Sequence, residues 1–161
     1  MATPLTLLMP VVPGTSVATL AGLIQQNLPA IDAALTSIGT VHYARFLVLD
    51  TTTPNLQPTG HTDTNNLVLA VITEYDNSFA SYISDFVNQL GEVFNALLAY
   101  VVIPKGVTLI PVQSNLIPFT NFVAANDYSQ MPGAPAMYEA YSSSVQQILA
   151  WEQGAGTAAG A

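Results

Sequence analysis

Apolar residues in this chain form four short runs with the length and composition of β-strands. Residues 5–12 (LTLLMPVV) are an apolar run closed by Pro13 and Gly14, which suits a buried strand that ends in a turn. Residues 41–49 and 67–75 are rich in β-branched and aromatic side chains, and 67–75 is the strongest strand pattern in the chain. Residues 136–141 (AMYEAY) alternate enough to predict a fourth strand.

Two longer segments repeat apolar residues every three or four positions, which is the spacing of one helix face. Residues 17–38 form the first, and Pro29 inside it predicts a kink or a restart. Residues 79–101 form the second and best helix. Asp76, Asn77 and Ser78 just before it offer capping side chains, and Asp76 is predicted to be the cap. Two shorter helices are predicted over residues 118–128 and 145–151.

The order strand, helix, strand, strand, helix, strand is the split βαβ arrangement of ferredoxin-like α+β domains. It predicts a four-stranded antiparallel sheet with both long helices on one face. Residues 1–153 are expected to form this single domain, with 50–66 as a polar loop and 103–133 as an irregular insertion that holds a short helix. Residues 154–161 (GAGTAAGA) are predicted to form a flexible tail.

The predicted strands at 41–49 and 67–75 are apolar at nearly every position, so both faces of the sheet need cover. In a chain of 161 residues with two long helices, a second copy of the same sheet is the simplest cover for the other face. We therefore expect a homodimer whose sheets pack face to face or close into a shared barrel.

The small number of charged residues, and the excess of acidic over basic ones, limit the classes of binding partner that we expect. Charged residues make up 7% of the chain and hydrophobic residues 50%, which excludes a disordered chain. With 2 Lys and Arg against 10 Asp and Glu, the net charge is -8, so we expect no nucleic acid and no anionic membrane surface as partner. Mean hydropathy is +0.42, but no apolar run reaches about 18 residues and no basic secretory start is present. We expect a cytoplasmic protein.

Three segments of the sequence resemble a known family. Residues 40–50 (TVHYARFLVLD) and the turn 74–78 (EYDNS) resemble the VHFARF strand and NYDGS turn of a bacterial family of dimeric α/β-barrel proteins, and 136–141 resembles its last strand. The likeness covers roughly residues 5–102 and 134–150. It implies a dimeric barrel of ferredoxin-like halves. The wider superfamily includes dye-decolorising peroxidases, cofactor-independent monooxygenases, haem-degrading enzymes, chlorite dismutase-like proteins and members without known activity, so haem is implied as a candidate cofactor.

Histidine and basic residues are so scarce that His42 and Arg45, in one predicted strand, are the first candidates for catalysis. Their spacing of three places them on opposite faces unless a bulge intervenes. In the functional interpretation one of them faces the barrel, with His42 as acid, base or axial ligand and Arg45 polarising an anion or a peroxide. In the structural interpretation Arg45 pairs with Glu74 or Asp76 across the sheet, and His42 is a satisfied structural residue.

Tyrosines on the predicted strands are candidates to line an apolar cavity that takes a small apolar molecule. We select Tyr43, Tyr75 and Tyr138, since such side chains combine an apolar body with a polar tip. No metal site is predicted, because His61 and Asp63 lie in the polar loop without zinc or EF-hand spacing. Sequence signatures of nucleotide-binding loops and serine hydrolases are missing as well.

Two classes of function therefore stay open. The one we favour is a binding or assembly module without catalysis, in which low surface charge favours association with a second copy or with a larger partner. The alternative is an oxidative enzyme, either peroxidase-like with haem or a cofactor-free monooxygenase, that uses His42 and Arg45.

Overall fold

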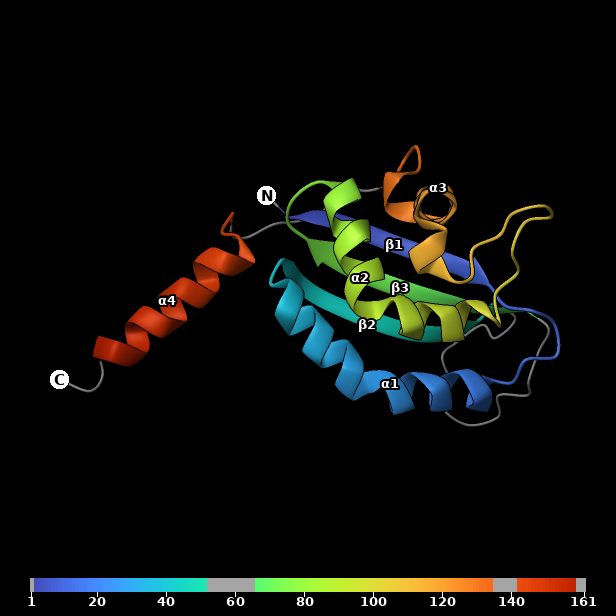
Figure 1. The fold of residues 1–161 in the computed structure, drawn as a ribbon, viewed down its shortest axis with the longest axis horizontal. Helices are drawn as coiled ribbons and strands as arrows, with labels where there is room; N and C mark the ends of the chain where they lie inside the picture. The colour runs from blue at the N-terminus through green and yellow to red at the C-terminus, as the bar shows by residue number, and fades with distance from the viewer. Residues whose placement is uncertain (1, 52–65, 135–141, 159–161) are drawn as a thin grey trace.

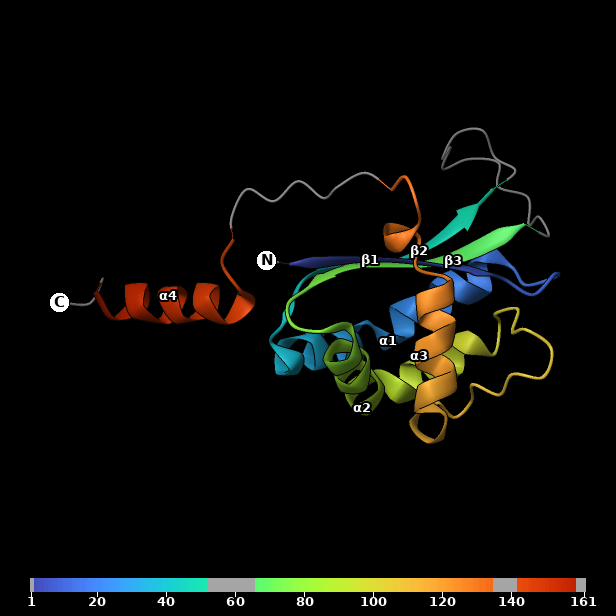
Figure 2. The same ribbon diagram turned by 90° about the horizontal axis from the view of Figure 1, so that it is seen from above.

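Three antiparallel strands form one sheet, and the two long helices lie together on one side of it (Figures 1 and 2). The computed structural model describes residues 2–51, 66–134 and 142–158. The elements in chain order are β1 (Thr3–Pro10), α1 (Val17–Ile38), β2 (Val41–Asp50), β3 (Leu67–Tyr75), α2 (Phe79–Leu98), η1 (Val112–Ser114), α3 (Leu116–Ala125), η2 (Tyr128–Gln130) and α4 (Val145–Ala158). The predicted α+β class with an antiparallel sheet is confirmed.

The strands follow the order β1-β3-β2, with β3 in the centre and antiparallel to both neighbours. The predicted fourth strand at 136–141 lies outside the described residues, so a four-stranded ferredoxin-like sheet stays a prediction. The segment before η2 borders the outer edge of β1. There the amide of Leu8 donates to the carbonyl of Asn126 at 3.1 Å, and the amide of Thr6 donates to Oδ1 of Asp127 at 3.0 Å. These bonds satisfy two amides of an edge strand.

Alternation along the strands gives the sheet two different faces. Leu7 of β1 pairs with Val71 of β3 and Met9 pairs with Leu69, and all four side chains are buried. They point towards the helices, since residues two apart lie on the same face. The intervening residues point the other way, to the side that we call the open face.

Helix α1 begins and ends at local signals in the sequence. Ser16 Oγ accepts a hydrogen bond from the amide of Thr19 at 3.0 Å. At the other end Gly39 adopts a left-handed φ of 62° and donates its amide to the carbonyl of Leu35 at 3.1 Å. The helix continues through Pro29, so the predicted restart at that residue is wrong.

The cap of α2 differs from the prediction. Ser78 caps the helix, because its Oγ accepts from the amide of Ser81 at 3.3 Å. Asn77 adopts a φ of 76°, a left-handed conformation that asparagine tolerates better than most residues, and this turn separates Asp76 from the helix start. The prediction that Asp76 caps α2 is therefore wrong, since its carboxylate has tertiary partners instead.

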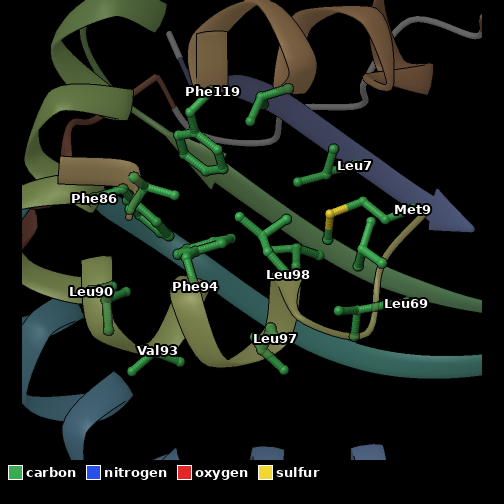
Figure 3. Close-up of a cluster of buried hydrophobic side chains, with 14 of the residues drawn as sticks. Leu7, Met9, Leu69, Phe86, Leu90, Val93, Phe94, Leu97, Leu98 and Phe119 are labelled. Atoms are coloured by element: carbon green, nitrogen blue, oxygen red, sulfur yellow. The ribbon is translucent and has the colours of Figure 1, made fainter. Parts of the chain in front are cut away.

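Helix α2 supplies the middle of the core. Its side chains and one from α3 converge on those of β1 and β3 (Figure 3). A chain of ring contacts crosses this core, from Tyr75 to Tyr82, Phe86, Phe94 and Phe119, with centroid distances of 3.9, 4.5, 6.0 and 5.4 Å. Stacked and tilted rings at such distances add to the stability from apolar burial.

The predicted insertion at 103–133 packs back against α2. Val112 is fully buried, and its amide donates to Asn95 Oδ1 of α2 at 2.9 Å. Gln113 lies directly over Gly91 and donates to Glu92 Oε1 at 2.7 Å. The predicted short helix exists as α3, although it ends earlier than expected, at Ala125.

Helix α4 projects from one end of the molecule, and its axis leads away from the sheet and from α1 and α2 (Figures 1 and 2). It continues to Ala158, so it includes part of the segment that the sequence predicted to be a tail. Two of its large apolar side chains are uncovered, because Leu149 is 43% and Trp151 is 63% exposed.

Candidate functional site

A hydrogen bond joins His42 to Asp76 at one end of the sheet. Between Val41 and Tyr43 the register of β2 shifts against β3, which makes His42 the extra residue of a β-bulge. Its Nε2 lies 3.1 Å from Asp76 Oδ1, and the two side chains are 13% and 12% exposed. An ionised carboxylate can only accept, so Nε2 donates and Nδ1 is the basic nitrogen of the neutral ring. A carboxylate that orients an imidazole in this way suits general acid–base chemistry.

Asp76 connects three distant parts of the chain. Besides His42, its Oδ2 accepts from the amide of Val145 at the start of α4 at 2.9 Å, and its own amide donates to the carbonyl of Thr40 at 2.8 Å. Thr40 is 6% exposed, and its Oγ1 has no hydrogen-bond partner among the described residues. The carboxylate of Asp76 is therefore engaged in holding α4 to the sheet end.

Arg45 lies apart from this contact. It is exposed on β2 opposite Ile72, and it forms no ion pair with any residue that the structure describes. The structural alternative, in which Arg45 pairs with Glu74 or Asp76, is thus not observed within the described residues. The structure does not bring His42 and Arg45 together, since His42 reaches beyond the end of β3 to Asp76.

Two of the three tyrosines selected from the sequence, Tyr43 and Tyr75, do not share a cavity. Tyr43 is 74% exposed on the open face, whereas Tyr75 is 2% exposed and stacks on Tyr82 in the core. Burial, and then the nearby carboxylate of Asp127, raise the pKa of Tyr75 to about 12. Tyr138 lies outside the described residues.

Side chains fill the space between sheet and helices. The pocket among Leu7, Tyr82, Phe86 and Phe119 leaves about 10 Å³, room for roughly one water molecule. A haem does not fit there, and Nε2 of His42, a nitrogen that could bind iron, is engaged with Asp76. The pocket therefore offers no space for the apolar ligand or the haem that the sequence made candidates.

The open face carries four rows of residues across β1, β3 and β2. From the His42 end, the rows are Pro4, Glu74 and Tyr43; Thr6, Ile72 and Arg45; Leu8, Ala70 and Leu47; Pro10, Val68 and Leu49. The last two rows consist of apolar residues, and Leu47 is 37% exposed. Helices α1, α2 and α3 all lie on the opposite side of the sheet (Figure 2). The open face thus combines an apolar surface with one positive charge.

The described parts of the chain contain neither a metal-ligand cluster nor a helix that could span a membrane. No group of three His, Asp or Glu side chains in residues 2–51, 66–134 and 142–158 could hold a metal ion. His61 and Asp63 lie outside those residues. In the same parts of the chain, no helix is long and apolar enough to cross a bilayer.

The chain matches no protein family, no curated protein sequence and no solved structure. The resemblance to dimeric α/β-barrel proteins consequently stays a prediction.

Sequence reasoning missed two features of the candidate sites. The hydrogen bond between the amide of Val145 and Asp76 could not be predicted from local sequence, because 69 positions separate the two residues. The partly exposed apolar row that contains Leu47 could have been found from the alternation of β2 and β3, once the register between them was known.

Proposed function

We propose that this protein is a homodimeric assembly module in which a second copy covers the open face of the sheet. The observation that carries the proposal is the pair of apolar rows on that face, with Leu47 37% exposed at the edge. Ala70 at the centre of these rows is buried, whereas Leu8, Val68 and Leu49 around it are half-buried. Apolar side chains that stay partly exposed side by side on a sheet face are typical of association sites. The filled core supports assembly over small-molecule binding, because the pocket of about 10 Å³ cannot hold an organic ligand.

The strand order is compatible with the dimeric barrel that the resemblance implies. Within the described residues β2 is an edge strand, and its outer edge pairs with no described strand. An edge of this type is a surface to which a strand of another chain can add. A shared barrel is therefore one form of the proposed dimer.

The test is the mass of the protein in solution, measured by sedimentation over a range of concentrations. We expect a dimer for the natural sequence and a monomer for Leu47→Glu, because a charge in the apolar rows opposes burial. Ile117→Glu is the matched control, since Ile117 on α3 is 75% exposed but lies on the other side of the sheet. A natural protein that stays monomeric at micromolar concentration contradicts the proposal.

A second candidate is general-base chemistry at His42, as in a cofactor-free monooxygenase. The hydrogen bond to Asp76 favours it, because it fixes the ring and leaves Nδ1 basic. The test is oxygen consumption with phenolic or dye substrates by the natural protein and by His42→Ala. Consumption that depends on His42 supports the enzyme, and consumption that is absent or indifferent to His42 contradicts it.

A further inference from the structure

From the geometry of α4 we propose that this helix of one copy lies on the open face of the second copy, with Glu152 paired to Arg45. The inference rests on the proposed dimer and names the part of the second copy that covers the face. It also places a helix, and not the partner's sheet, against the rows around Arg45.

The sequence of α4 gives it one apolar side with a single charge at its centre. Val145, Ile148, Leu149 and Glu152 recur at helical spacing, so they share one side of the helix. With 14 residues, including Gly154, a helix is only marginally stable by itself in water. A partner surface that buries the apolar side would stabilise the helix, and it would have to offer Glu152 a cation.

The open face offers that cation. The chain has 2 Lys and Arg residues, and Arg45 is the one that lies on this face, between the apolar row of Leu47 and the row of Tyr43. It is exposed and has no acidic partner among the described residues. Glu74 lies on the same face in the row of Tyr43, so repulsion would keep Glu152 on the β2 side, near Arg45.

Helix α4 does not reach the open face of its own chain. The amide of Val145 is held by Asp76 Oδ2 at 2.9 Å, at the end of the sheet. From there the helix leads away from the sheet in both views (Figures 1 and 2). While this bond holds, the apolar side of α4 can meet the open face of another copy only.

The open face is long enough to hold the helix. The 10 residues of β2 make the face about 33 Å long. Helix α4 has 14 residues and is therefore about 21 Å long, so it fits within that length.

Charge reversal tests the proposal. Arg45→Glu and Glu152→Arg each place two like charges in both copies of the interface, so we expect each variant alone to dimerise at least tenfold more weakly. An equimolar mixture of the two variants forms a mixed dimer with an opposite pair at both contacts, and this dimer should approach the natural affinity. Matched controls are Lys105→Glu and Asp32→Arg, which reverse exposed charges elsewhere and should leave the affinity unchanged.

If the natural protein is a dimer but the single variants dimerise as tightly, the inference about α4 is overturned while the proposed dimer stands. A mixture that dimerises no better than the single variants also overturns the inference. A monomeric natural protein overturns both.

Discussion

His42 Nε2 lies 3.1 Å from Asp76 Oδ1, although His42 is near the start of β2, Asp76 directly follows β3, and 34 positions separate them. The second oxygen of Asp76 accepts the first amide of α4. The position that the sequence assigned to a helix cap is thus a junction between the sheet and the C-terminal helix. The candidate base chemistry and the inference about α4 both depend on it, since it orients His42 and sets the direction of α4.

Replacement of Asp76 should loosen this junction. We expect Asp76→Ala to lower the free energy of unfolding by about 1–3 kcal/mol, because it leaves the largely buried His42 without its acceptor. The amide of Val145 should exchange with solvent faster. Denaturant unfolding and hydrogen exchange measure the two effects. Asp85→Ala on α2 is the control, and an equal loss of stability in both variants would contradict the junction.

The hydroxyls of Thr73 and Tyr82, 2.6 Å apart, form a buried hydrogen bond in the core. Tyr82→Phe should cost about 1–2 kcal/mol of stability, because the hydroxyl of Thr73 then stays buried without its partner. The double variant Thr73→Val, Tyr82→Phe should recover part of that loss, since both polar groups are removed together. Denaturant unfolding of the single and double variants measures the coupling. Additive losses would show that the bond contributes nothing.

Stability should fall at high pH because of the buried tyrosines. The pKa of Tyr75 rises from 10.0 to about 12 in the folded protein, and burial also raises the pKa of Tyr82. The unfolded chain therefore loses these protons first, and the stability that is complete below pH 10 declines as the pH rises towards 12. Unfolding measured across this range should show a shallower decline for Tyr75→Phe. Tyr128→Phe controls for the loss of an exposed phenol, and parallel curves for Tyr75→Phe and the natural protein would refute the assignment.

Replacement of two helix glycines by alanine should change the stability of the protein in opposite directions. Nothing lies within 4 Å of the Cβ position at Gly22, so Gly22→Ala should stabilise the protein by up to about 1 kcal/mol. At Gly91 the new Cβ would lie 2.6 Å from Gln113 Nε2, and Gln113 must move and weaken its bonds to Glu92 and Asn95. We expect Gly91→Ala to gain nothing or to destabilise. Thermal unfolding of the pair measures the difference, and an equal gain would show that Gln113 moves without cost.

Local patterns in the sequence were enough to predict most of the secondary structure. Apolar runs with β-branched residues predicted β1, β2 and β3, and spacings of three and four predicted α1 and α2, because these signals come from neighbours along the chain. The α+β class followed from the order of the elements. The sequence offered Asp76, Asn77 and Ser78 as caps of α2 and favoured Asp76. The left-handed turn at Asn77 makes Ser78 the cap.

The candidate sites depended on contacts that no local pattern contains. His42 and Arg45 are three residues apart in β2. Because of the bulge in β2, His42 forms a hydrogen bond with Asp76, whereas Arg45 lies on the open face opposite Ile72 of β3. Tyr43 and Tyr75 were selected together, but sheet register placed one in solvent and the other in the core. The sequence by itself determined where strands and helices form, because spacing sets which side chains share a face. Only the tertiary structure decided which faces are buried, because burial is fixed by residues that are distant in the chain.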